Sequence, residues 1–138
     1  MLFPKKVKYR KWQTRRKNPK KISTATRGTK LSFGAYGLKS MKYVRIKSNQ
    51  IEAARRVISR SMGKSGRVWI RVFPDRPFTA KPAEVGMGKG KGDIQGYQFE
   101  VLPGAIIFEV DGVEESVARE ALRKAGAKLP LTSKVVSR

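Results

Sequence analysis

The hydrophobic side chains of this chain recur with two different spacings, and each spacing predicts a different kind of element. Between residues 50 and 62 they return every three or four positions, which is the repeat of one helix face. That face carries Ile51, Ala54, Ile58 and Met62. Asn49 is a suitable N-cap residue, and Glu52, three positions later, completes a capping-box pattern. The sequence therefore predicts a helix over residues 50–62 that ends near Gly63 or Gly66.

Two segments of the first half have the alternation typical of β-strands. Residues 31–38 alternate large apolar with small residues, and the glycines there indicate a curved strand or a close approach to another backbone. Residues 67–73 alternate more regularly, so that Val68, Ile70 and Val72 share one side, which we expect to face the helices. Trp69 and Phe73 lie on the other side, where they form either a second cover layer or a base-stacking surface.

The second half of the chain predicts a hairpin, a helix and a last strand. Residues 97–102 and 105–110 flank Pro103-Gly104, which indicates an antiparallel hairpin. A helix is expected from near Val113, because acids open it and basic residues close it before Gly126 and Pro130. Its predicted buried face carries Val117, Ala121, Leu122 and Ala125. Residues 131–136 follow as a final strand.

These elements predict an α+β fold, a two-layer α/β sandwich with two helices on a mostly antiparallel sheet. The chain of 138 residues fits one such domain. We place this domain at residues 31–138, behind a basic extended N-terminal arm of residues 1–30.

A long loop without clear periodicity is expected over residues 74–96, and loops of this length are usually functional or disordered. Within it, glycine alternates with Met87, Lys89 and Lys91. Glycines such as Gly88 and Gly90 let backbone amides approach a phosphate closely, and the lysines add mobile charge. A flexible linker is the alternative. The spacing matches neither a dinucleotide fingerprint nor a Walker motif, so we expect no ATP, NAD or other cofactor.

The net charge of the chain indicates what kind of partner it binds. The chain has 32 Lys and Arg against 10 Asp and Glu, a net charge of +22. Residues 1–73 hold 22 of the basic groups and one acid, whereas residues 74–138 hold 10 basic and 9 acidic groups. Such a one-sided excess calls for a polyanion, either nucleic acid or an anionic membrane. The absence of Cys and His excludes disulfides, thiol nucleophiles and imidazole bases.

The arm carries 12 of these basic side chains and no acid, interleaved with aromatic rings. We expect it to be extended or disordered until a partner orders it, because it cannot bury enough apolar surface. Its basic groups neutralise phosphates. Tyr9 and Trp12 either stack on unpaired bases or anchor the arm to its own domain. The residues assigned to RNA binding in the arm are Lys5, Lys6, Lys8, Tyr9, Arg10, Lys11, Arg15 and Arg16.

The predicted helix adds a basic ridge. Arg56, Arg60 and Lys64 follow at fourfold spacing, with Arg55 beside them. We expect no acidic partners at those spacings, which favours a ridge that faces phosphates over an ion-paired surface.

No apolar run has the length of a membrane span, so a soluble protein with no membrane partner is expected. No apolar segment follows the basic N-terminus, which argues against a secretory signal peptide. An organelle transit peptide remains an alternative for residues 1–30, since they are basic, contain Ser and Thr and lack acids.

The sequence resembles the bacterial-type large-subunit ribosomal protein sixteen family (universal ribosomal protein family L-sixteen/L-ten-e). Any one matching block is weak, but together they occur in family order across almost the whole chain. The blocks are Met1-Leu2, Pro4-Lys5, residues 8–11, 32–38, 50–56, 69–75, Lys81-Pro82, residues 87–92, 111–113, 118–121 and 128–130.

The resemblance implies an α/β sandwich that binds the long rRNA of the large subunit, of the 23S type, adjacent to the 5S rRNA. It also implies a place by the A-site and P-site tRNA near the peptidyl transferase centre, among neighbouring large-subunit ribosomal proteins, in the cytoplasm. The rRNA role carries over to Lys5, Lys8, Arg10, Lys11, Arg55 and Arg56. The tRNA-side role carries over to Lys81, Met87, Lys89 and Lys91.

Two departures from the family pattern alter local contacts. Gly86 stands where the family usually has an arginine that some bacteria hydroxylate, so this chain lacks that cation and its modification. Gln95-Gly96-Tyr97 replaces a usual Glu-Tyr-Trp run. The arm between Lys11 and Leu31 is also several residues longer than usual.

The leading hypothesis is therefore a non-catalytic rRNA-binding component of the large subunit that helps to seat tRNA and supports assembly and translation. A metal-dependent nuclease built on Asp75, Asp93 and Asp111 is a second class, although no motif unites these residues. A free-standing RNA or DNA chaperone is a third.

Overall fold

The computed structural model describes all residues, 1–138, and confirms the α+β class. The chain has two α-helices and seven strands, and the strands form two mostly antiparallel sheets rather than the single sheet expected. The helices are α1 (Ser48–Met62) and α2 (Glu115–Gly126). The strands are β1 (Tyr36–Ser40), β2 (Val44–Lys47), β3 (Arg67–Ile70), β4 (Arg76–Ala80), β5 (Asp93–Val101), β6 (Ile106–Asp111) and β7 (Ser133–Ser137).

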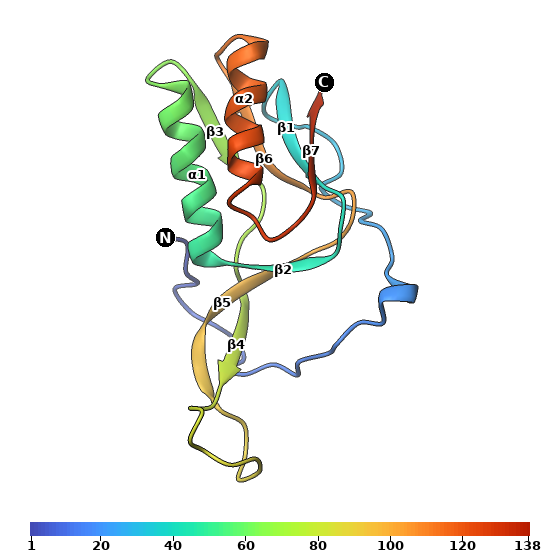
Figure 1. Cartoon of the computed structure of the whole chain (residues 1–138), viewed down its shortest axis with the longest axis vertical. Helices are drawn as coiled ribbons and strands as arrows, with labels where there is room; N and C mark the ends of the chain where they lie inside the picture. The colour runs from blue at the N-terminus through green and yellow to red at the C-terminus, as the bar shows by residue number, and fades with distance from the viewer.

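The larger sheet has the order β3-β6-β1-β7, and both helices pack side by side on one face of it (Figure 1). The sheet contributes Leu38, Phe108 and Val110 to the core between the layers, all at most 1% exposed. The helices contribute apolar faces whose residues recur at helical spacing. Those faces are Ile51, Ala54, Ile58 and Met62 on α1 and Ala118, Ala121, Leu122 and Ala125 on α2.

The opposite face of this sheet is covered by the residues that directly follow the arm. Glu109 on β6 is fully buried there, and its carboxylate accepts hydrogen bonds from the backbone N–H of Ser32 at 2.6 Å and Phe33 at 3.3 Å. Arg71 pairs with the same carboxylate at 3.0 Å. The Phe33 ring stacks on Trp69, with centroids 6.0 Å apart. Trp69 therefore belongs to a cover layer, whereas Phe73 is 41% exposed and does not join it.

The smaller sheet has the order β2-β5-β4, and its β4–β5 hairpin extends away from the two-layer body (Figure 1). The expected loop over residues 74–96 is wrong in extent, because β4 and the start of β5 occupy both its ends and leave residues 81–92 as the connection. No strand was expected at β4, because Pro77 lies within it. Proline is tolerated in β4 because β4 is an edge strand.

The expected hairpin of residues 97–102 and 105–110 is also wrong. A turn does form, since Ala105 N–H donates to the Leu102 carbonyl at 3.2 Å. However, β5 pairs with β2 and β4, whereas β6 pairs with β1 and β3. The arm backbone lies at this crossing, where Ala25 N–H donates to the Pro103 carbonyl and Ile106 N–H donates to the Gly28 carbonyl, both at 2.8 Å. The turn thus carries the chain from one sheet to the other.

Several element boundaries differ from expectation. The strand expected at 31–38 lies at 36–40, because the backbone at residues 32 and 33 bonds to Glu109 rather than to a strand. The strand expected at 67–73 ends at Ile70, that at 131–136 lies at 133–137, and β2 was not expected. Asn49 is not the N-cap of α1, which begins earlier. Lys47 is the N-cap, and its N–H donates to the Gln50 side chain at 2.8 Å.

The second helix also departs from the prediction at its start. It begins at Glu115 rather than near Val113, with Glu114 as the N-cap. Val117 is wrong as a core residue, since it is 36% exposed and Ala118 takes the buried position beside it. Neither helix has the length and hydropathy that a membrane-crossing segment requires.

Candidate nucleic-acid interface

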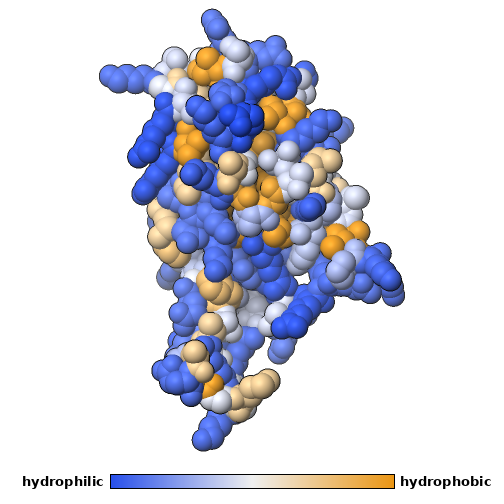
Figure 2. Space-filling model, in the orientation of Figure 1, coloured by the Kyte–Doolittle hydropathy of each residue, from blue (hydrophilic) through white to orange (hydrophobic).

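The basic side chains predicted in the arm are all exposed on one continuous path. The arm starts beside the N-terminal end of α1, where Ser48 Oγ donates to the Leu2 carbonyl at 2.7 Å. From there it runs along the β4–β5 hairpin and returns past one 3-10 turn, Pro19–Lys21, to β1 (Figure 1). Figure 2 shows mostly hydrophilic residues, with a few apolar ones, over the lower part of the molecule, where the hairpin extends. The exposed residues include Lys5, Lys6, Lys8, Tyr9, Arg10, Lys11, Arg15 and Arg16.

Two arginines of the smaller sheet hold the middle of this arm. Arg76 on β4 is buried, and its Nη2 donates to the carbonyls of Gln13 at 2.6 Å and Thr14 at 2.8 Å. Arg45 on β2 donates to the Thr14 carbonyl and, at 2.9 Å, to the Arg15 carbonyl. These donors are charged and their acceptors are backbone carbonyls, so these bonds do not use the arm's own cations.

Glu100 on β5 balances the charge of this contact. It pairs with Lys17 of the arm at 3.2 Å and with Arg76 at 3.4 Å, and it accepts a hydrogen bond from the Tyr43 hydroxyl at 2.8 Å. Burial alone raises the pKa of Glu100, but the bonds from Tyr43 and Lys17 and the charges of Lys17 and Arg76 together outweigh it and lower the pKa below its ordinary value. Burial raises the pKa of Tyr43, and its bond to Glu100 raises it further. Glu100 is therefore a carboxylate that fastens the arm to the body.

The predicted tRNA-side residues lie together at the far end of the hairpin, where every residue from 81 to 91 is exposed. Gly88 and Gly90 have φ near +92°, and Lys89 between them has φ of +59°. The Lys81 ammonium donates to the Gly88 carbonyl and closes the loop. Met87 is fully exposed. The backbone therefore takes the left-handed conformations that glycine favours, and it presents Lys89 and Lys91 at an outer end of the molecule.

The arm and the loop touch. The Lys11 ammonium donates to the Lys91 carbonyl at 3.3 Å, across eighty residues of sequence. The contact brings two predicted groups of cations, one from the arm and one from the hairpin end, onto the same part of the surface.

Two arginines of the basic ridge on α1 form ion pairs, whereas no acidic partner was expected. Glu52 lies one turn before Arg55 and Arg56 and pairs with them at 2.5 Å and 3.3 Å. The Arg55 bond lowers the pKa of Glu52 from 4.5 to about 2 and raises the pKa of Arg55. Arg60 and Lys64 are exposed and take part in no ion pair of the structure. The spacing of three and four residues back to Glu52 was a readable signal for this pairing.

The two aromatic rings of the arm have different surroundings. The Arg76 guanidinium lies 5.3 Å from the centroid of Trp12, which is 39% exposed. Tyr9 is 60% exposed, and only the Lys8 ammonium is placed against its ring, at 5.6 Å. Trp12 thus contacts its own domain through one cation while part of its surface remains free.

The residues that hold the arm were missed from the sequence. Arg45, Arg76 and Glu100 lie 30 or more residues from the arm positions that they contact. Nothing in their local sequence distinguishes them from solvated surface charges.

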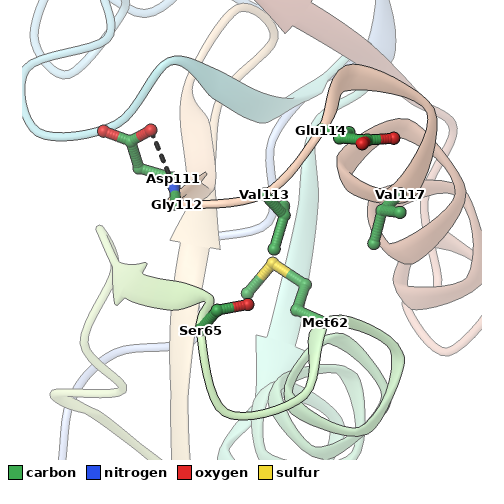
Figure 3. A pocket seen from close by; sticks show the side chains of 7 residues that line it. All are labelled: Met62, Ser65, Asp111, Gly112, Val113, Glu114 and Val117. Carbon is green, nitrogen blue, oxygen red and sulfur yellow. Dashed lines mark hydrogen bonds between the residues drawn. The ribbon is translucent and has the colours of Figure 1, made fainter.

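A hollow of about 550 Å³ lies where the end of α1 meets the start of α2 (Figure 3). Its lining includes Met62, whose side chain points towards Val113, with Asp111 and Glu114 at the rim. Asp111 accepts a hydrogen bond from Gly112 N–H at 2.8 Å. The hollow is shallow, carries carboxylates and holds none of the predicted site residues, so it does not extend the basic surface.

The acids of the nuclease alternative are separated. Asp75 and Asp93 lie at opposite ends of the β4–β5 hairpin, and Asp111 ends β6 in the other sheet. No three acidic side chains come together in a group that could hold a metal ion. The structure therefore offers no support for that alternative.

Comparisons with known proteins bear on the whole chain. A family model described as ribosomal protein L16p/L10e matches residues 4–136. The large ribosomal subunit protein uL16 of Caulobacter vibrioides is 54% identical over 138 residues, which is 100% of this chain and 94% of that protein. The uL16 of Bartonella bacilliformis is 55% identical over 139 residues, and that of Chelativorans sp. 53% over 138; each match covers 100% of this chain and 98% of the relative.

Proposed function

The chain belongs to the ribosomal protein L16p/L10e family, and from this membership we propose that it is a structural, non-catalytic constituent of the large ribosomal subunit of a bacterial-type cytoplasmic ribosome. Its proposed partners are 23S-type rRNA near the 5S rRNA, the A-site and P-site tRNA, and neighbouring large-subunit proteins. The observation that carries this proposal is the continuous basic surface that joins the arm to the outer end of the β4–β5 hairpin.

The arm and α1 are assigned to rRNA. The arm exposes its cations along a backbone that Arg76 and Arg45 hold in place, so less conformational entropy is lost when phosphates bind. Arg60 and Lys64, at the other end of α1 from the start of the arm, add exposed cations without acidic partners. Arg55 and Arg56 share Glu52 and therefore contribute less net charge than their number suggests.

The hairpin end is assigned to tRNA. The hairpin extends beyond the two-layer body (Figure 1), so its end can contact a second RNA while the arm and α1 bind rRNA. Lys89 and Lys91 have no acidic partner among the ion pairs, and the two positive-φ glycines keep the backbone open to a phosphate. Gly86, in place of a cation, leaves these two lysines with Lys81 as the cations of the loop, which also carries one acid, Glu84.

Removal of residues 1–30 tests the rRNA assignment. We expect weaker incorporation into large subunits in a reconstitution or complementation assay, because twelve cations are lost. A full-length variant with Lys5, Lys6, Lys8, Arg10 and Lys11 replaced by Gln separates charge from folding, since it keeps the backbone bonds of the arm. Normal incorporation of both variants would contradict the assignment.

Replacement of Lys89 and Lys91 by Ala tests the tRNA assignment. Assembly is expected to be normal, while tRNA occupancy of the A site or P site falls and the slope of log affinity against log salt decreases by about 2. Lys128→Ala with Lys134→Ala is the matched control, because both lysines are exposed and lie outside the hairpin. Equal occupancy for the two double variants in filter binding would count against the loop.

A further inference from the structure

A pocket of about 330 Å³ lies where the arm crosses β4, and it combines aromatic rings with cations. This volume is at the lower end of the ~300–1,000 Å³ typical of small-ligand sites, which suits one planar group rather than a strand. Six residues line it: Tyr9, Lys11, Trp12, Gln13, Arg15 and Arg76. No carboxylate is among them, although nine acids lie in the second half of the chain.

We propose that this pocket binds one unpaired nucleotide of RNA, with its base against Trp12 and Tyr9 and its flanking phosphates on Lys11 and Arg15. The proposal rests on the proposed function, since it names a subsite within the arm's rRNA surface.

The aromatic side chains leave room for a base. Trp12 and Tyr9 both line the pocket, and they remain 39% and 60% exposed. The contacts between two aromatic rings lie elsewhere, between Phe3 and Tyr97 and between Phe33 and Trp69. A base stacks on an aromatic face without regard to its identity, because every base has a π-face. An exposed tryptophan beside an open volume therefore favours a base over a bare anion.

The wall of the pocket is built before any ligand arrives. Arg76 is 7% exposed, and Nη2 is occupied by the carbonyls of Gln13 and Thr14 while Nη1 lies 3.4 Å from Glu100. Its guanidinium carbon also lies over the Trp12 ring, 5.3 Å from the centroid. Arg76 therefore fixes the orientation of the ring and of the arm backbone, and it acts on a ligand through them.

The remaining charges are free for an anion. The Lys11 ammonium bonds only to a neutral backbone carbonyl, that of Lys91, and Arg15 is exposed with no carboxylate partner. Both side chains can therefore bind phosphates on either side of a nucleotide. A duplex does not fit this arrangement, because its bases are already stacked and paired.

The test uses the full-length chain with a single-stranded adenosine 12-mer RNA and an abasic ribose-phosphate 12-mer that carries the same charge. The wild type is expected to bind the adenosine RNA about 5- to 150-fold more tightly, the range that one base–aromatic stack implies. Trp12→Ala is expected to remove the difference, whereas Trp12→Phe keeps most of it. Val7→Ala, an exposed apolar change in the same arm outside the pocket, keeps it fully.

Trp69→Phe leaves Trp12 as the only tryptophan, so its fluorescence reports the pocket directly. Quenching at saturation with the adenosine RNA, and none with the abasic polymer, is the expected result. Equal affinity for the two polymers, or binding without a change in Trp12 fluorescence, would overturn the nucleotide pocket while leaving phosphate binding by the arm intact. Failure to bind either polymer would instead contradict the proposed function.

Discussion

Arg76 fastens the arm to the body, and its replacement by Ala gives a measurable consequence. The side chain is buried and donates to the Gln13 and Thr14 carbonyls. Hydrogen bonds from a charged donor contribute about 1.5–3 kcal/mol each, and removal of one partner of a buried ion pair costs about 3–5 kcal/mol. Glu100 keeps Tyr43 and Lys17 as partners, which places the expected loss at the lower end, about 3 kcal/mol.

That loss applies to docking of the arm, so limited proteolysis with trypsin is the suitable assay. The arm offers cleavage sites at Arg15, Arg16 and Lys17, close to the carbonyls that Arg76 holds. A weakening of about 3 kcal/mol raises the population of the open arm, and with it the cleavage rate, by roughly 100-fold. Arg76→Lys is expected to give an intermediate rate, because lysine lacks the planar fork.

Arg67→Ala is the control, since Arg67 is exposed on the edge strand β3 and is absent from the ion pairs. Cleavage of Arg76→Ala at the wild-type rate would refute the reasoning. It would mean that the arm is held by other contacts or is not held at all.

Three further predictions concern the body and its charges. Gly34→Ala is expected to destabilise the fold by about 2 kcal/mol or more in urea unfolding, because the new Cβ would lie 2.5 Å from the Val110 carbonyl oxygen. Gly86→Ala is the control, since its Cβ would meet nothing within 4 Å, and its stability should stay within about 0.5 kcal/mol of the wild type. Equal stability of the two variants would contradict the close packing at Gly34. Glu109→Ala is expected to cost about 3–5 kcal/mol by the same measurement, since it leaves Arg71 without its partner and two partly buried N–H groups without an acceptor. A loss under about 1 kcal/mol would be inconsistent with the pair between Arg71 and the buried Glu109. The native pKa of Glu52 is about 2 and its ordinary value is 4.5, so its contribution to the free energy of unfolding is present above pH 4.5 and is lost as pH falls towards 2. Glu52→Gln should therefore flatten the dependence of stability on pH in that window. Parallel pH profiles for the variant and the wild type would argue against the Arg55 bond.

The sequence predicted what depends on local spacing. The buried face of α1 was correct because Ile51, Ala54 and Ile58 recur at the helical period. The end of α1 was expected near Gly63 or Gly66, and it lies at Gly63, where φ is +71°. Val117 failed because Ala118 takes the buried position beside it, and a small residue such as alanine carries a weak hydrophobic signal.

What depends on pairing at a distance was not predictable in the same way. Pro103-Gly104 correctly indicated a turn, but the partners of β5 and β6 come from β2, β4, β1 and β3. The site shows the same division. Its cations and loop could be predicted from composition, whereas Arg45, Arg76 and Glu100, which position them, are separated from the arm by at least 30 residues.

The central claim is that the arm binds rRNA while the hairpin end reaches tRNA. A density map of the large subunit that carries this chain and bound tRNA tests it most directly. The account predicts residues 81–91 against tRNA in the A or P site, and residues 5–16 against rRNA phosphates. A map in which the hairpin end lies buried in rRNA or protein, away from both tRNA sites, would contradict it.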